Sequence, residues 1–492
     1  FEDTQKLLKR FKYDKSLHEN QNITDDMQTN FTSFKSETSF NEKYQYITFS
    51  LLRRFNRNPF FMQCFSYYNL SSPVLFLAAP LVGLIVPFFV LRFKGIKISL
   101  KLYLSMMKTI LKNTFIGRGM SGFQNGNMNQ RVSIIVSFMF FLFQIYQNVM
   151  SCITLYSNMT DIHNFIEKYK VYIKYTLVNI ETLKLYVSKL PSYTEFYHDL
   201  CKNELSLSKT LQSLNSILPL NKNLTKLAQM GMLLKLNYEL FYDSHYYDSF
   251  IYSMNVNQYI NDLTKIQKRI KERKINKREF KSKSSNSMNG LYYLPHIEND
   301  SVVKNSISLK SNLIITGPNA SGKTTLLKSL LINLIVSQQW GYGCFESCKI
   351  PVYDNFYSYL NIPDTSNRDS LFQAESRRCK EIFVDIYDHK KERSFCIFDE
   401  IYSGTNPTDA VLCATAYLKA MNSMKHKCDF VLTTHYLQLC KDLDDEESIH
   451  NMKMKTIVKE RKLQYTYSVV DGISDINGGK QVLLDLEYPK FI

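Results

Sequence analysis

The stretch that decides the fold is Ile314-Ile315-Thr316-Gly317-Pro318-Asn319-Ala320-Ser321-Gly322-Lys323-Thr324-Thr325. A short apolar strand, residues 313–315, precedes a loop with the spacing Gly-x4-Gly-Lys-Thr, and an amphipathic helix follows. This order is typical of a P-loop, because glycines let successive backbone N–H groups curl around a phosphate and the helix directs its positive dipole end at the same point. The alternative is a structural Gly-rich turn, which would not need Lys and Thr at this spacing. We therefore expect residues 317–325 to bind the phosphates of ATP.

Four residues in two segments have distinct expected roles. Lys323 would reach the β- and γ-phosphates, and the hydroxyl of Thr324 would bind Mg²⁺. A second apolar run, residues 394–398, ends in Asp399 and Glu400, and such runs belong in parallel sheets covered on both faces. We expect Asp399 to hold Mg²⁺ through water and Glu400 to orient or deprotonate the attacking water. The alternative is an exposed Asp-Glu pair that opens a turn.

A third apolar run, residues 431–434, ends in His435. A polar residue at the carboxyl end of a core strand faces the ligand crevice of such sheets. His435 is therefore predicted to sense the γ-phosphate, and its neutral form would hydrogen-bond the lytic water.

The segments between these strands resemble the MutS family. Residues 370–375 match a Ser-x-Phe-x-x-Glu signature, and residues 399–409 are similar to Asp-Glu-Ile-Gly-Arg-Gly-Thr-Ser-x-x-Asp, with Tyr402 and Ser403 in place of Gly and Arg. Residues 472–482 are similar to a Gly-x-Ser-x-x-x-x-Gly-x-x-Val element. The Leu-Ser-Gly-Gly signature of ABC and SMC ATPases does not occur in the sequence. The resemblance extends from Leu291 to the end.

The resemblance implies an ATPase that works as a dimer with two composite nucleotide sites. Ser370 of one subunit would face the γ-phosphate bound by the other, and Asp409 would lie in the loop after the acidic pair. Family members read a mismatch with an N-terminal Phe-x-Glu motif. Residues 40–42 fit this bare pattern but lie in a polar stretch, so they are not a convincing copy.

The predicted fold is an α/β P-loop NTPase domain, with a mostly parallel sheet flanked by helices, preceded by an all-helical region and an apolar two-helix hairpin. We expect a weakly ordered lead-in at 1–57, the hairpin with a basic amphipathic connection at 58–160, a lever- or core-like helical region at 161–290 and the ATPase at 291–492. The helical region ends in a basic run, 265–283, and a Ser-rich linker, 282–289. We expect this run to be a solvated helix end that leads into the linker; the alternatives are contact with phosphates and a nuclear address.

The hairpin prediction depends on two stretches without charged residues, 58–91 and 132–160. Each is long enough to cross about 30 Å of hydrocarbon. Residues 92–131 between them carry Lys and Arg but no acid, as a basic amphipathic helix on anionic headgroups would. The alternatives are a buried helical core and a re-entrant hairpin. The re-entrant form would keep the basic residues on the side of the ATPase.

Composition limits the partners. The net charge of +16 over 492 residues favours nucleic acid or an anionic membrane face, unless it merely reflects codon composition. The ten cysteines include one close pair, Cys344 and Cys348, without zinc-site partners, so we expect reduced thiols and an intracellular location, with membrane association a further option and the ATPase then on the cytoplasmic side.

The function that fits best is an ATP-dependent, DNA-binding ATPase of MutS type, acting as a dimer on mismatched or branched DNA with ATP and Mg²⁺ as cofactors. One alternative is a membrane-anchored, ABC-type ATPase that drives a transport or tethering change without DNA. Another is a tether that uses nucleotide as a slow switch.

Overall fold

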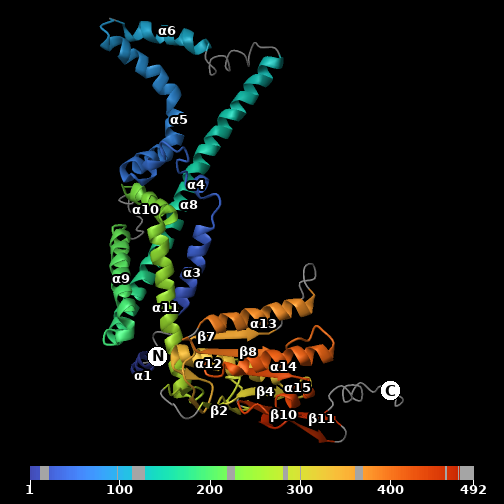
Figure 1. Cartoon of the computed structure of the whole chain (residues 1–492). Helices are drawn as coiled ribbons and strands as arrows, with labels where there is room; N and C mark the ends of the chain where they lie inside the picture. The colour runs from blue at the N-terminus through green and yellow to red at the C-terminus, as the bar shows by residue number, and fades with distance from the viewer. Residues whose placement is uncertain are drawn as a thin grey trace. The chain divides into compact units, whose positions relative to one another are not determined.

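The computed structural model of the chain describes residues 1–11, 21–96, 98–113, 128–218, 228–280, 286–299, 301–360, 370–389, 391–459, 462–474 and 476 (Figure 1). The chain forms two compact units. The C-terminal unit contains Phe1–Tyr13, Leu190–Ser192 and Asp262–Ile492, and the helical unit contains Asp14–Lys189 and Tyr193–Asn261. The boundaries between the two units do not coincide with the expected domain boundaries at residues 57, 160 and 290. Residue 160 lies inside the helix α8 (Met128–Val187) because no Gly or Pro interrupts it, and residue 290 lies inside the strand β2 (Ser287–Leu291).

The C-terminal unit is built around a six-stranded sheet with the order β11-β10-β4-β9-β8-β7. The pairs β10–β4, β4–β9, β9–β8 and β8–β7 are parallel, and only β11 pairs antiparallel within this sheet. All residues of β4 and β9 are buried, as expected for central parallel strands. The strands are β4 (Asn312–Thr316), β7 (Asn355–Tyr359), β8 (Ser394–Asp399), β9 (Cys428–Thr434), β10 (Ile449–Lys459) and β11 (Lys462–Asp471).

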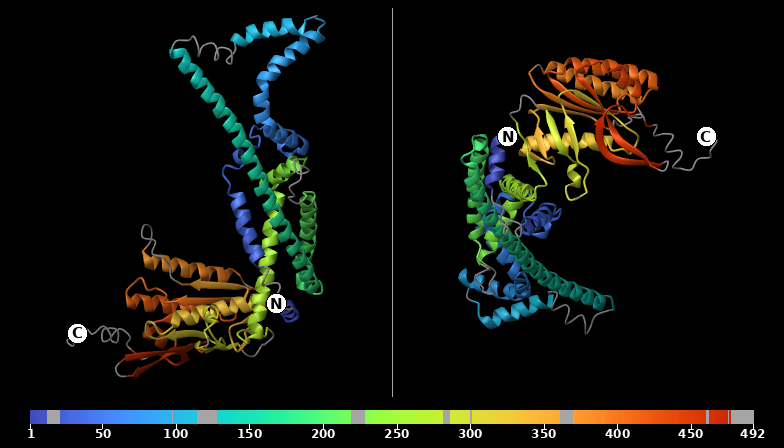
Figure 2. Two further views of the ribbon diagram at one scale, coloured as in Figure 1. Left: turned by 180° about the vertical axis from the view of Figure 1, so that it is seen from behind. Right: turned by 90° about the horizontal axis from the view of Figure 1, so that it is seen from below.

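Helices cover both faces of the sheet (Figure 2). One apolar core joins Leu327 and Leu330 of α12 to Ile315, and the other joins Cys379 of α13 and Leu418 of α14 to the opposite face. A helical region followed by an α/β sheet domain was predicted from the sequence, and at this level the prediction is confirmed. The helices are α1 (Glu2–Arg10), α12 (Lys323–Trp340), α13 (Leu371–Asp388), α14 (Pro407–Ser423) and α15 (Leu437–Asp442), and the smaller elements are β1 (Asn276–Lys277), β3 (Asn305–Ser308), β5 (Tyr342–Gly343), β6 (Ser347–Lys349) and η4 (Leu294–His296).

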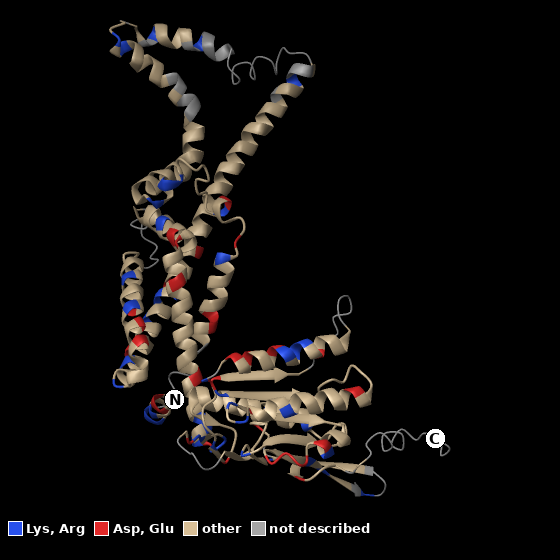
Figure 3. Ribbon diagram, in the orientation of Figure 1, with Lys and Arg blue, Asp and Glu red and all other residues tan. Residues whose placement is uncertain are grey.

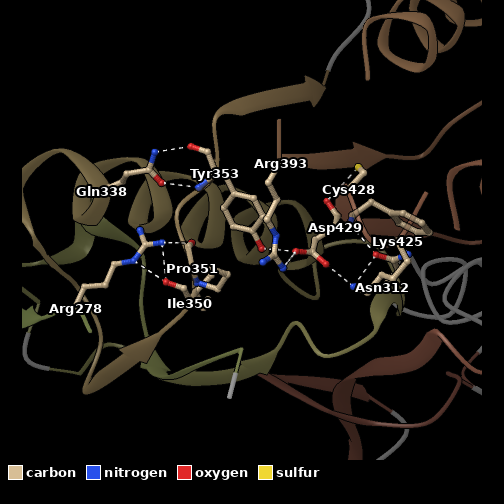
Figure 4. Close-up of polar contacts among 11 residues, drawn as sticks. Arg278, Asn312, Gln338, Ile350, Pro351, Tyr353, Arg393, Lys425, Cys428 and Asp429 are labelled. Carbon is tan, nitrogen blue, oxygen red and sulfur yellow. Dashed lines mark hydrogen bonds and ion pairs between the residues drawn. The ribbon is translucent and has the colours of Figure 1, made fainter. Parts of the chain in front are cut away.

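A buried polar network lies at the amino ends of β8 and β9 (Figure 4). The carboxylate of Asp429, 1% exposed, accepts hydrogen bonds from the Tyr353 hydroxyl at 2.7 Å and the Arg393 guanidinium at 2.8 Å, and it also pairs with Lys425. Burial and the neighbouring carboxylate together raise the pKa of Tyr353 well above its ordinary value, so this phenol remains a donor. The network holds the amino ends of β8 and β9 together, at the edge of the sheet opposite the carboxyl ends of the strands.

Arg278 corrects one sequence-based expectation. The sequence places it in a basic run ending in a solvated linker, but its side chain is fully buried and donates to the carbonyl oxygens of Leu334, Ile350 and Pro351. Burial lowers the pKa of its guanidinium. The expected linker is also shorter, since β2 begins at Ser287.

The helical unit has an aromatic core. Phe31 stacks on Phe250 with ring centroids 3.7 Å apart, and Tyr169 packs beside both rings. Its elements are α3 (Gln21–Lys35), α4 (Phe40–Lys43), η1 (Arg53–Arg57), α5 (Pro59–Phe93), α6 (Leu100–Asn113), α8, α9 (Thr194–Asn215) and α10 (Met230–Tyr242). Two further elements, η2 (Pro191–Tyr193) and α11 (Ser244–Lys271), contain residues of both units.

The described residues of the N-terminal segment, 1–11 and 21–57, differ from the expected weakly ordered lead-in. Leu7, Phe31 and Phe40 are buried, because single apolar side chains spaced among polar ones anchor each short helix. Phe40 stacks on Phe241 at 3.7 Å and is 2% exposed. Its ring is therefore not available to stack on a base, which agrees with the doubt about the Phe-x-Glu pattern at 40–42.

Candidate functional site

The glycine-rich loop joins β4 to α12 and has the backbone geometry of an anion cradle. Gly322 and Ala320 have left-handed φ angles of 97° and 63°, and α12 begins at Lys323. A Cβ added to Gly322 would lie 3.1 Å from the Tyr467 ring, so this position also lacks room for a side chain. Consecutive N–H groups near a helix N-terminus attract a phosphate. The buried hydroxyl of Ser321 has no hydrogen-bond partner among the described residues, as a ligand-facing group would.

Lys323 links the loop to the ends of two strands. Its ammonium donates to the Gly317 carbonyl at 3.0 Å, lies 3.2 Å from Nε2 of His435 and 3.8 Å from Oε1 of Glu400. Its side chain is 6% exposed, and burial lowers the pKa of this ammonium. A cation is thus held at the mouth of the loop by carbonyl and carboxylate oxygens.

Glu400 and His435 follow the adjacent strands β8 and β9. Glu400 has a left-handed φ of 54°, and its N–H donates to the Thr433 carbonyl at 3.0 Å. The chain therefore leaves the extended conformation of β8 at this residue. Its Oε1 lies 2.7 Å from His435 Nε2. The hydrogen bond with His435 holds the pKa of Glu400 below its ordinary value, so Glu400 is ionised at neutral pH.

Asp399 and Thr324 form an oxygen-rich pair beside this cluster. The Thr324 hydroxyl donates to Oδ2 of Asp399 at 2.8 Å, and the Thr433 hydroxyl bonds the other oxygen. Hard oxygen donors of this kind suit Mg²⁺. In the part of the chain that the structure describes, no three His, Cys, Asp or Glu side chains gather to hold a metal by themselves. A magnesium ion here would therefore need phosphate oxygens and water as further ligands.

Glu375 holds the turn after Glu400, a role that the sequence did not predict. Its buried carboxylate accepts hydrogen bonds from Ser403 N at 3.1 Å, Ser403 Oγ at 2.8 Å and Gly404 N at 3.1 Å. A Cβ on Gly404 would lie 2.8 Å from the backbone N of Phe372. Glu375, in the MutS-like segment 370–375, thus holds Gly404, in the MutS-like segment 399–409. In the sequence, the presence of both segments was the only signal for this contact.

Ser370 and Asp409 make local contacts at helix starts. Ser370 is exposed and caps α13 by accepting from Gln373 N at 3.3 Å, while Asp409 donates from its N–H to Asn406 Oδ1 at 2.9 Å at the start of α14. Neither belongs to the cluster around Lys323. Ser474 N donates to Thr316 Oγ1 at 2.8 Å, but the rest of the tail element, 477–482, lies outside the described residues.

A cavity of about 520 Å³ extends from the loop. Residues 319–326 and Glu400 form one side, and the residues that line the remainder include Tyr293, His296 and Tyr467. No motif marks these three residues, so the sequence analysis missed them.

The comparisons with known proteins agree with this arrangement. The family model of MutS domain V matches residues 313–492. A segment of 190 residues, 38% of this chain, is 28% identical to a DNA mismatch repair protein MutS of Acholeplasma laidlawii and covers 22% of that protein. A segment of 206 residues, 41% of this chain, is 27% identical to the protein of the same name from Bacillus thuringiensis, again covering 22% of it. The chain thus matches about a fifth of the length of these relatives, and the part of it that matches the MutS family model is domain V, at residues 313–492.

Proposed function

We propose that the chain is a MutS-like P-loop ATPase that hydrolyses MgATP at the cluster of Lys323, Glu400 and His435. The observation that carries the proposal is the convergence of these groups, from three separate elements, within 2.7–3.8 Å of one another. Loop amides and the Lys323 ammonium bind the β- and γ-phosphates. Glu400, ionised and oriented by His435, takes the proton of the attacking water. His435 lies where it can also contact the γ-phosphate.

Thr324 and Asp399 are the proposed magnesium residues. Their oxygens fit the hard-donor preference of Mg²⁺. When bound, the ion neutralises charge on the β- and γ-phosphates. Thr324 would bind it directly and Asp399 through water, with Thr433 holding the Asp399 carboxylate in orientation.

The cavity supports a nucleoside triphosphate rather than a small anion. Phosphate groups would fill the part at residues 319–325, and the base would enter the part lined by Tyr293 and His296. Aromatic rings at that end offer stacking surfaces for a purine.

We propose that two chains complete each site. Ser370 stands exposed at the N-terminus of α13, so its hydroxyl and the helix dipole are open to a phosphate held by a second copy. When the two chains close over ATP, the way in which they bind a partner would change. The MutS resemblance around residues 370–375 and 399–409 supports this arrangement.

DNA is the proposed partner of the ATPase. The named relatives are DNA mismatch repair proteins, and the chain carries a net charge of +16. Electrostatic binding to DNA weakens steeply with salt, so gel retardation of branched and plain duplexes over several salt concentrations tests the proposal. The second candidate, a membrane-anchored ATPase without DNA, is favoured by the exposed apolar helices of the helical unit.

Replacing Asp399 by Asn tests the magnesium assignment. The amide keeps one oxygen but loses the charge, so we expect the Mg²⁺ concentration for half-maximal ATP turnover to rise about tenfold or more. Phosphate release by the full chain, titrated with Mg²⁺, measures the effect. Asp388→Asn removes an exposed carboxylate at the end of α13 and is the control. Wild-type turnover that persists in EDTA would contradict the proposal.

A further inference from the structure

Two helices of the helical unit have long segments whose described apolar side chains are largely exposed. In α5 the buried residues Met62 and Ser66 are followed by a segment, residues 74–91, with many exposed apolar side chains. In α8 burial begins at Leu155, and the described residues of 132–153 before it are largely exposed. Examples with their exposed fractions are Val74 67%, Leu77 51%, Phe138 53%, Phe140 69% and Phe143 54%.

The two segments meet within the unit and have similar lengths. Phe76 of α5 packs on Phe141 of α8 with ring centroids 5.4 Å apart, and Cys152 Sγ lies 3.6 Å from the Leu70 carbonyl. Each segment has about 20 residues and is therefore about 30 Å long at 1.5 Å per residue, the thickness of the hydrocarbon layer of a bilayer. By length and apolar composition α8 is long enough to cross a membrane, and none of its most apolar window is buried.

Residues 59–91 and 132–160 contain no Asp, Glu, Lys or Arg. The described parts of these segments are tan in Figure 3, without blue or red. Apolar side chains predominate in both segments, although Gln144, Gln147 and Asn148 lie at the spacing of one face of α8. Exposed apolar side chains on several faces of a helix need apolar surroundings, which lipid provides. DNA is excluded as the occupant because these segments have no cation to neutralise a phosphate.

Positive charge collects where the apolar segments end. Arg92 and Lys94 follow the segment of α5, Arg131 precedes that of α8, and the sequence from 92 to 131 contains no acid. The helix α6 adds Lys101 and Lys108 beside the exposed Leu102 and Leu104. Its Tyr103 ring packs on Phe88 of α5 at 4.9 Å. Cations next to apolar helix ends match anionic lipid headgroups.

We propose that residues 74–91 of α5 and residues 132–153 of α8 insert into an anionic lipid bilayer, with the basic helix α6 against its headgroups. The occupant is lipid, chosen over a second copy of the chain because the exposed apolar surface ends in a basic, acid-free segment. The proposal stands independently of ATP hydrolysis, since it involves none of the residues at the nucleotide site.

Flotation with vesicles tests the inference. The full chain, purified in mild detergent, is diluted into vesicles of phosphatidylcholine alone or with 30% phosphatidylglycerol added, and then centrifuged through a density gradient. We expect the chain to float with the anionic vesicles and to remain bound after a high-salt wash. In the double variant Leu77→Arg/Leu142→Arg, the fraction of protein bound to vesicles should fall at least tenfold, because transfer of Arg into hydrocarbon costs free energy.

A matched control lies on the same helix. Leu185, 79% exposed near the C-terminal end of α8, lies outside the proposed segment, so Leu185→Arg should float like the wild type. Lys101→Gln/Lys108→Gln should reduce capture by anionic vesicles several-fold. A chain that stays at the bottom of the gradient with both vesicle types, as a monomer or as an oligomer, would overturn the proposal. Equal loss in Leu185→Arg and in the double variant would overturn it too.

Discussion

Replacing Glu400 by Gln is expected to lower ATP turnover by about 10²–10⁴-fold while nucleotide binding persists. The amide has nearly the size of the carboxylate and can still contact His435, but it cannot take a proton from water. Glu400 is ionised and so can accept a proton, because its hydrogen bond with His435 holds its pKa below the ordinary value. Single-turnover hydrolysis, measured beside binding of a non-hydrolysable ATP analogue, separates the chemical step from affinity.

The control for this variant is Glu381→Gln, which removes a carboxylate of α13 that is 57% exposed and pairs with the nearby Arg378. We expect its turnover to equal that of the wild type. A Glu400→Gln protein that hydrolyses ATP at the wild-type rate would remove Glu400 from the mechanism, and a protein that no longer binds the analogue would show that Glu400 acts in binding instead.

Replacing Asp429 by Asn is expected to lower the local free energy of unfolding of the sheet by about 3–5 kcal/mol. The carboxylate is 1% exposed and balances Arg393 and Lys425 while accepting from Tyr353. The Asn side chain keeps the shape but leaves two cations without their counter-charge in a buried site. Native-state hydrogen exchange of the β8 and β9 amides reports this free energy without requiring the whole chain to unfold in one step.

Asp471→Asn is the control for the sheet. Asp471 pairs with His450 on the surface and is 81% exposed, so its loss should change the exchange of the same amides by less than about 0.5 kcal/mol. Unchanged exchange in Asp429→Asn would mean that hydrogen bonds, and not charge, hold the network together.

Much of the candidate nucleotide site could be predicted because each part has a local signal. A strand before Gly317 and a helix after it identify the loop, and the polar residues Asp399 and His435 end two apolar runs. Parallel strands bring such residues to one edge of the sheet, and the pairing of β8 with β9 brings Glu400 to within 2.7 Å of His435. The roles of these residues remain predictions, while the MutS resemblance is confirmed.

The remainder depends on contacts between distant segments. Arg278 reads as one more cation of a basic run, yet it is buried against carbonyl groups some 55–75 residues away in the sequence. Glu375 contacts a turn 28 residues later, and Phe40 packs on Phe241. Neither charge nor periodicity encodes such partners. The apolar runs of α5 and α8 are visible in the sequence, but only the structure shows that most of their described apolar side chains are exposed.

The central claim is that the loop before α12 holds ATP with the help of Lys323. Calorimetric titration of the purified full chain with an ATP analogue and Mg²⁺ tests it most directly. We predict one nucleotide bound per chain, and loss of this binding in Lys323→Ala, whose side chain no longer reaches the phosphates. Absence of binding by the folded wild-type chain, or equal binding by Lys323→Ala, would contradict the account.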